Sequence, residues 1–221
     1  MSVVKFIQFI GVTMMTAVVL SGCQTGAPLA GYEAAGQPGQ SAYDQPESGD
    51  APPRDNAVFV YGGKWSDNRF IDILRLESEL RGSYLAAVGY SRTLHRFNEH
   101  LHLEGEANVA RHWGKQSHFE VNAAANLRWN AFPWDRFVNT SFAYGLGPSY
   151  AFGRPVIEER RNRPLSRGLV FMIAELTFAP PKQRASPWEG FIRIHHRSGA
   201  FGVVSDAGGS NFITSGARYR F

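Results

Sequence analysis

The segment Leu101–Trp113 reads LHLEGEANVARHW, and apolar and polar residues alternate along it with a period of two. Leucine, glycine, alanine and valine occupy the odd-numbered positions as far as Val109, whereas histidine, glutamate and asparagine occupy the even-numbered ones. The same alternation recurs in Phe119–Asn130 (FEVNAAANLRWN) and Ile213–Phe221 (ITSGARYRF). Because successive side chains of a strand point to opposite faces, this period predicts β-strands with one apolar and one polar face.

The lengths and ends of these segments separate a membrane barrel from a soluble β-sandwich. Several segments run for ten to fourteen residues. Ordinary globular strands have roughly 5–6 residues, and tilted strands that cross a bilayer need ~9–11. The final Tyr219-Arg220-Phe221 resembles the terminal signature that the outer-membrane barrel assembly machinery recognises. These features favour a transmembrane β-barrel, with a soluble periplasmic β-domain as the weaker alternative. Aromatic residues gather at the segment ends, as an interfacial girdle requires: Trp113, Trp129, Phe132, Trp134, Tyr144, Tyr150, Trp188, Tyr219 and Phe221.

We therefore expect an all-β fold, an eight-stranded antiparallel transmembrane β-barrel over residues 57–221. An even strand number places both ends of the barrel on the periplasmic side, so the longer links at 64–81, 152–167 and 200–209 face outward. Side chains fill a barrel of this size, so it is not a pore. Strands are expected near 57–63, 82–92, 100–113, 117–130, 137–151, 168–179, 188–199 and 210–221. Charged residues of both signs are expected to point inward and to pair there: Glu104, Glu106, Glu120, Glu175, Arg128, Arg193 and Arg218.

The N-terminal region has the pattern of an export signal, with Lys5 ahead of a short, interrupted apolar run. Leu20-Ser21-Gly22-Cys23 resembles the lipobox of bacterial lipoproteins. The resemblance implies that Cys23 is acylated and becomes the new N-terminus, and that Gln24, where a sorting aspartate would stand, directs the chain to the outer membrane. An ordinary signal peptide with a chance cysteine is the alternative. The expected organisation is a lipoprotein signal peptide at 1–22, a tether at 23–56 and the barrel at 57–221.

Composition supports the tether and narrows the classes of function. Residues 24–56 hold five glycines, five prolines and five acids against one arginine. Such a segment cannot bury enough surface to offset its ordering entropy, so we expect a disordered acidic tether. The formal charge is +1 for the signal, −4 for the tether and +7 for the barrel, and we expect no nucleic-acid partner. The single cysteine excludes an internal disulfide.

No nucleotide, haem or iron–sulfur motif is present, so we expect no cofactor and no metal site. His100, His102 and His112 share the face that the alternation assigns to the lumen. His100 and His102 could ligate a metal together with Glu104, but hydrogen bonding within the lumen is the favoured interpretation.

The candidate for chemistry lies in Ile192–Ala200, which reads IRIHHRSGA. By alternation, His196 and Ser198 continue the lipid-facing stripe of the isoleucines, whereas His195 and Arg197 point inward. Residues two apart on one strand face lie roughly 7 Å apart at their Cα atoms, so their side chains can approach hydrogen-bond range. A histidine beside a serine can act as a general base and activate the hydroxyl.

This arrangement resembles the PagL-type lipid A deacylase family, whose members are eight-stranded outer-membrane barrels that remove an ester-linked acyl chain from lipopolysaccharide. The resemblance implies a catalytic His-x-Ser on the outer face of the penultimate strand, matched here by His196-Arg197-Ser198, and a catalytic glutamate at the start of the last strand. Asn211 stands at that position. It can orient an imidazole, as an asparagine does in papain-like proteases, but it carries no charge. Gly199 stands where the family has an asparagine that helps to form the oxyanion hole. Asp206 and Glu175 are alternative acids.

Two functions follow from these residues. The first is a hydrolase with Ser198 as nucleophile, His196 as base and Asn211 as orienting residue, in which Arg160, Arg161 and Arg163 of the outer loop bind lipid A phosphates. The second is a non-catalytic outer-membrane barrel lipoprotein with a structural or lipopolysaccharide-binding role. An ordinary charged surface loop is the alternative for the arginines. The expected partners are lipid A or lipopolysaccharide, the outer membrane and, during insertion, the assembly machinery.

Overall fold

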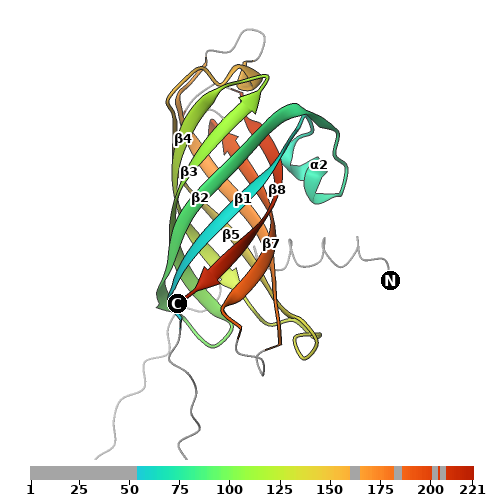
Figure 1. Ribbon diagram of the computed structural model, residues 1–221, viewed down its shortest axis with the longest axis vertical. Helices are drawn as coiled ribbons and strands as arrows, with labels where there is room; N and C mark the ends of the chain where they lie inside the picture. Colours follow the sequence, from blue (N-terminus) through green and yellow to red (C-terminus); the bar gives the residue numbers. More distant parts are fainter. Residues whose placement is uncertain (1–53, 160–164, 182–185, 201–203, 205–207) are drawn as a thin grey trace, which may run out of the picture. The chain divides into compact units, whose positions relative to one another are not determined.

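Eight antiparallel strands form a closed barrel in sequence order, with β8 paired back onto β1 (Figure 1). This computed structural model describes residues 54–159, 165–181, 186–200, 204 and 208–221. The expected all-β, eight-stranded antiparallel barrel is thereby confirmed, whereas the expected signal peptide, Cys23 and nearly all of the tether lie outside the described residues. The strands are β1 (Asn56–Ser66), β2 (Leu80–Arg96), β3 (Leu101–Gly114), β4 (His118–Trp129), β5 (Asn139–Ala151), β6 (Gly168–Ala179), β7 (Trp188–Ser198) and β8 (Ser210–Arg220).

The strand boundaries differ most from expectation in the first hairpin. There β1 continues to Ser66, and β2 runs from Leu80 to Arg96 rather than over 82–92. A register shift in the β1–β2 ladder lies between Lys64 and Ser66, and such irregularities let paired strands continue while the ladder bends.

The outer wall of the barrel is apolar and ends in aromatic residues. Trp113 stacks on Tyr84 at one end, with ring centroids 6.0 Å apart, and Trp188 contacts Tyr219 at the other end, with centroids 5.0 Å apart. Two aromatic bands around an apolar belt are what a membrane-spanning barrel presents to lipid. The exposed apolar side chains between the bands include Val58, Val60, Val88, Val109, Val121, Leu127, Leu146 and Ile192.

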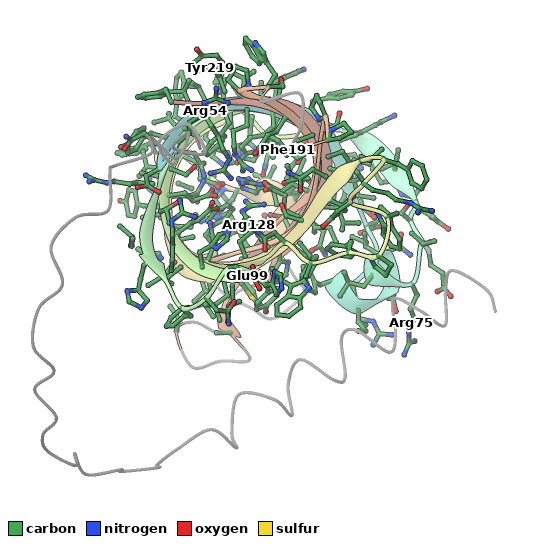
Figure 2. The ribbon with its side chains drawn as sticks, turned by 90° about the horizontal axis from the view of Figure 1, so that it is seen from below. Arg54, Arg75, Glu99, Arg128, Phe191 and Tyr219 are labelled. Carbon is green, nitrogen blue, oxygen red and sulfur yellow. The ribbon has the colours of Figure 1, made fainter. Side chains whose placement is uncertain are left out.

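The lumen holds the network of paired charges that the alternation predicts. Figure 2, a view along the barrel, shows these side chains gathered inside the wall around Arg128. Glu175 is the centre of the network, because it accepts hydrogen bonds of 2.8–3.0 Å from Arg128, Arg193 and Arg218. Glu106 receives both terminal nitrogens of Arg193, at 2.8 and 2.9 Å. All seven residues named above as inward-facing are buried, so the predicted facing is confirmed.

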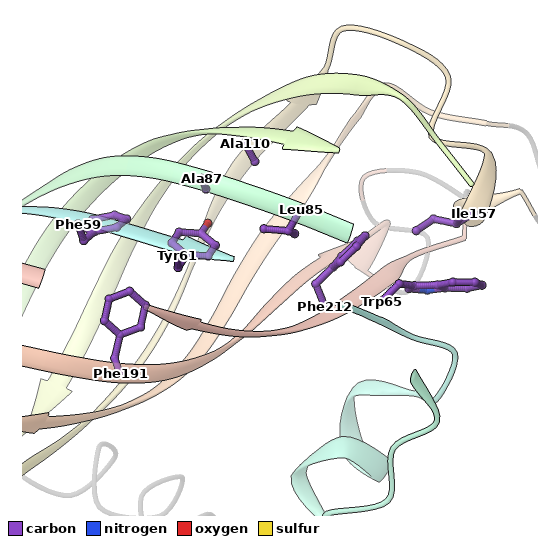
Figure 3. Close-up of a cluster of buried hydrophobic side chains, with 9 residues drawn as sticks. All are labelled: Phe59, Tyr61, Trp65, Leu85, Ala87, Ala110, Ile157, Phe191 and Phe212. Carbon is purple, nitrogen blue, oxygen red and sulfur yellow. The ribbon is translucent and has the colours of Figure 1, made fainter. Parts of the chain in front are cut away.

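One side of the lumen is aromatic rather than charged. Phe59, Tyr61 and Phe191 pack together within the wall (Figure 3), with ring centroids 6.0–6.3 Å apart. The Arg193 guanidinium lies 5.0–5.2 Å from the centres of these three rings. Cations are attracted to aromatic faces, so the rings stabilise buried arginines as well as filling space.

Two short helices lie in the β1–β2 and β5–β6 links, which are expected to face outward. Helix α2 (Phe70–Leu74) follows β1 and lies outside the wall near the ends of β1 and β8 (Figure 1). Its Ile73 is buried against Ala174 and Ile194, and Phe142 and Ile213 pack around them. The 3₁₀ helix η1 (Val156–Glu158) follows β5 and buries Ile157 and Glu158. Within the described ranges, no helix is long and apolar enough to cross a membrane.

Candidate functional site

The site forms where the outer end of β7 pairs with the start of β8. The register places His196 directly opposite Asn211. Their side chains meet on the outer face, with His196 Nδ1 2.6 Å from Asn211 Oδ1. His195 and Arg197 alternate with this face and are fully buried in the lumen, whereas His196 and Ser198 are partly exposed.

The hydrogen bonds of Asn211 determine which nitrogen of His196 carries the proton. Asn211 Nδ2 donates to the backbone carbonyl of Asn68 at 2.8 Å. A carbonyl can only accept, so the amide nitrogen must point at Asn68 and the amide oxygen at the imidazole. His196 Nδ1 therefore bears the hydrogen and donates it to Asn211. In the neutral ring, Nε2 is then left with a free lone pair, which is the state that a general base requires.

Helix α2 and the turn before it cover this histidine from outside the barrel. The Phe70 ring lies 5.0 Å from the His196 ring, centroid to centroid. The same turn supplies the Asn68 carbonyl that fixes Asn211. Packing of Ile73 on Ala174 and Ile194 holds the helix against the wall. The β1–β2 link thus orients the histidine, and sequence reasoning missed Asn68 and Phe70 because nothing in their spacing connects them to β7.

Ser198 lies two residues beyond His196 on the same strand face. Its hydroxyl oxygen accepts a hydrogen bond of 3.1 Å from the Ala200 N–H. Among the described residues, it is not hydrogen-bonded to the imidazole, so the structure brings His196 and Asn211 together but does not join the serine to them. Ala200 has φ of 51°, in the left-handed region that side chains other than glycine rarely adopt. Such strain clusters at functional sites.

Of the two alternative acids considered from the sequence, Glu175 does not reach the site. Glu175 is buried in the lumen beneath three arginines. Asp206 lies outside the described residues, as do Arg160, Arg161 and Arg163, so their expected roles remain predictions.

The histidine–glutamate metal set considered from the sequence is not assembled. His100 is partly exposed, with Nε2 3.4 Å from Glu99, rather than on the lumenal face. Glu104 is held by Arg128 and Arg220 at 2.8 and 3.0 Å. This correction has a simple cause, since β3 begins at Leu101 and His100 belongs to the preceding turn.

A shallow apolar groove of about 600 Å³ lies on the outer wall between the site and the middle of the barrel. Gly62 and Gly63 of β1 line it together with Trp113, Ile192 and Ile213. Ile213 also packs beside Ile73 of α2, so the groove begins next to the helix that covers His196. A groove with these walls can take an extended hydrocarbon chain.

Comparison with known proteins identifies a similar fold. No protein-family model matches the chain, and no curated protein matches its sequence. Among solved structures, the barrel is similar to one described as the crystal structure of the outer membrane enzyme PagL. The match has a TM-score of 0.50 and 11% sequence identity, and it covers 75% of this chain and 99% of that chain. At this identity the similarity concerns the fold: the chain has the eight-stranded barrel that this outer-membrane enzyme also has.

Proposed function

We propose that this chain is an outer-membrane acyl-ester hydrolase that acts on lipid A. Ser198 is the nucleophile, His196 is the general base, and Asn211 orients the base. The observation that carries the proposal is the 2.6 Å hydrogen bond between His196 Nδ1 and Asn211 Oδ1 on the outer wall of the barrel. It leaves Nε2 unprotonated on the face that also bears the serine.

The location of the site supports a lipid substrate. The apolar belt and its two aromatic bands are suited to a bilayer, and the fold is shared with an outer-membrane enzyme. Strand β7 ends in an outward link, so His196 and Ser198 lie at the level of the outer leaflet, where lipid A resides.

The chemistry follows from the two side chains and one water molecule. Ser198 Oγ attacks the ester carbonyl carbon while His196 Nε2 takes the hydroxyl proton. The tetrahedral intermediate expels the sugar alkoxide, which receives that proton from His196, and an acyl-serine remains. Water then attacks the acyl-serine with His196 again as base, which releases the fatty acid and restores the serine. The Ala200 N–H, which donates to the resting hydroxyl at 3.1 Å, is close enough to assist the developing oxyanion.

Two surfaces would hold the substrate. The apolar groove beside α2 has the shape and chemistry to take an acyl chain, and Arg160, Arg161 and Arg163 of the β5–β6 link would pair with the phosphates. The proposed role of Cys23 is a second attachment to the same membrane.

A second candidate is a non-catalytic barrel lipoprotein that binds lipopolysaccharide or supports the envelope. Two observations favour it: Asn211 supplies no negative charge to an imidazolium, and the Ser198 hydroxyl is engaged by Ala200 rather than by His196.

Lipid A mass spectrometry separates the two candidates. Lipid A would be extracted from Gram-negative cells that express wild type, Ser198→Ala or the control Ser91→Ala, which alters a buried lumenal serine. We expect wild type and the control to yield lipid A lighter by one ester-linked acyl chain, and Ser198→Ala to yield unmodified lipid A. Identical lipid A from all three strains, with the protein folded in the outer membrane, would favour the non-catalytic candidate.

A further inference from the structure

Two histidines and a glutamate meet inside the barrel beneath the turn that joins β3 to β4. His112 and His118 are directly opposite each other in the register, and their rings stack with centroids 4.5 Å apart. Glu120 lies two residues further along the same inward face. One nitrogen from each histidine and one carboxylate oxygen all lie within 4.8 Å of one another, and all three residues are buried.

His118 is the unusual member of this cluster, because both of its ring nitrogens are buried and neither has a hydrogen-bond partner. The residue is 4% exposed. The neighbouring Gln116 amide oxygen is also buried and unpartnered, although its nitrogen lies 3.1 Å from His112 Nδ1. A buried polar group without a hydrogen-bond partner is unfavourable. A bound ion that accepts an electron pair from His118 would supply a partner that the protein itself does not provide.

The remaining hydrogen bonds prepare the ligand atoms. Gln116 Nε2 lies 3.1 Å from His112 Nδ1, and in the metal-free protein His112 Nε2–H donates to Glu120 Oε2 at 3.1 Å. When an ion takes the place of this hydrogen on Nε2, the hydrogen moves to Nδ1, where the Gln116 amide turns over and accepts it with its oxygen. Ligand atoms around a tetrahedral metal lie roughly 3.3 Å apart, as follows from bond lengths of ~2.0–2.1 Å. This pair is already near that spacing, whereas the three ligand atoms as a set lie within 4.8 Å of one another. His118 is stacked on His112 with the ring planes 16° apart, so its ring must turn and move inward by up to about 1.5 Å to become the third ligand.

The other carboxylate oxygen is held by an outer layer of contacts. Glu120 Oε1 lies 2.8 Å from His195 Nε2, and His195 Nδ1 lies 2.9 Å from the Tyr61 hydroxyl. Such outer contacts orient metal ligands. Arg197 places a positive charge beside the cluster, with Nε 3.4 Å from Glu120 Oε2. Its guanidinium also pairs with Glu158 at 2.8 Å, so it keeps a hydrogen-bond acceptor when Glu120 binds a cation.

We propose that His112, His118 and Glu120 form a binding site for one zinc-class divalent cation at the outer end of the barrel lumen. Two imidazoles and one carboxylate are ligands that Zn²⁺ accepts, and a water molecule fills the fourth position. The bound ion ties β3 to β4 and, through Glu120 and His195, to β7. Its role is to stiffen the barrel end that carries His196, and it takes no part in the hydrolysis.

The test uses the untagged, folded full chain in detergent micelles, stripped with a chelator and then given Zn²⁺ alone. We expect about one Zn²⁺ per chain to remain after gel filtration and the melting temperature to rise. His118→Ala is expected to weaken binding by tenfold or more. The folded metal-free barrel should tolerate this change, because His118 makes no hydrogen bond there. His95→Ala, which alters an exposed histidine of β2, is the matched control and should bind as wild type does.

A spectroscopic measurement separates loss of metal binding from misfolding of a variant. Co²⁺ in place of Zn²⁺ should give wild type the visible absorption of a four-coordinate ion, and the bands should be lost in His112→Ala and His118→Gln. The proposal is overturned if stripped wild type retains no more Zn²⁺ than His118→Ala, or if both histidine variants bind as tightly as His95→Ala. Because these readouts do not involve lipid A, they succeed or fail independently of the proposed hydrolase activity.

Discussion

Replacing Asn211 by alanine tests how the imidazole is oriented. The change removes the oxygen that accepts from His196 Nδ1 at 2.6 Å and the nitrogen that donates to the Asn68 carbonyl at 2.8 Å. A shielded donor left without a partner costs about 1–3 kcal/mol. Since 1.36 kcal/mol is tenfold in rate, we expect kcat to fall roughly 5- to 150-fold. The assay is release of fatty acid from purified lipid A in detergent micelles, quantified by mass spectrometry, with kcat and KM determined separately.

Two further variants make that result interpretable. Asn211→Asp keeps an oxygen facing His196 and adds the charge that stabilises an imidazolium, although its second oxygen faces the Asn68 carbonyl. We expect it to turn over faster than Asn211→Ala. Asn122→Ala alters a buried lumenal asparagine that donates to Asn108 at 2.9 Å, and its kcat should stay within about twofold of wild type, because it does not touch His196. An Asn211→Ala protein that folds and keeps wild-type kcat would refute the orienting role.

Three other predictions concern the network, the outward links and the cover of the site. Glu175→Gln leaves three buried arginines short of an anion, so the free energy of unfolding in urea should fall by about 3–5 kcal/mol, far more than for Glu189→Gln at the rim. Burial raises the pKa of the Glu158 carboxyl in η1 to about 7, despite the opposing charge of Arg197. When folding raises the pKa of a carboxyl, its contribution to the free energy of unfolding is complete below the pKa of the unfolded state. That contribution is lost as the pH rises through the pKa of the folded state. Wild type should therefore lose about 3 kcal/mol relative to Glu158→Gln between pH 4.5 and pH 8, and parallel urea midpoints for the two proteins would contradict this. Phe70→Ala removes the ring on His196 and should lower kcat about 2- to 13-fold, with an unchanged rate counting against a role for α2.

The barrel could be predicted from sequence because alternation determines which side of the wall each residue faces. If Leu101–Trp113 forms a strand, Glu104 and Glu106 must point into the lumen. Arginines that point inward from other strands at the same height along the barrel axis can then pair with them. The aromatic side of the lumen was missed because Phe59 and Tyr61 lie in a short segment where both faces are apolar. Hydrophobic periodicity cannot assign the inward face of a strand when the residues on both faces are apolar.

Contacts between loops and the wall could not be predicted in this way. Phe70 covers His196 only because Ile73 finds a pocket beside Ile194, and no local pattern records that docking. The cluster of His112 and His118 is an intermediate case. A tight turn between β3 and β4 sets these residues opposite each other, so the expected strands already imply the pair. That neither ring nitrogen of His118 has a hydrogen-bond partner depends on the packing around it.

We propose Ser198 as an acyl-transfer nucleophile on the outer wall of this barrel. The most direct measurement is exposure of the folded full chain to a serine-directed fluorophosphonate, followed by peptide mass spectrometry. Wild type and Ser91→Ala should gain one adduct, located on Ser198, and His196→Ala should label far more slowly. Labelling that is absent from Ser198 in wild type, or that persists at an equal rate without His196, would contradict the account.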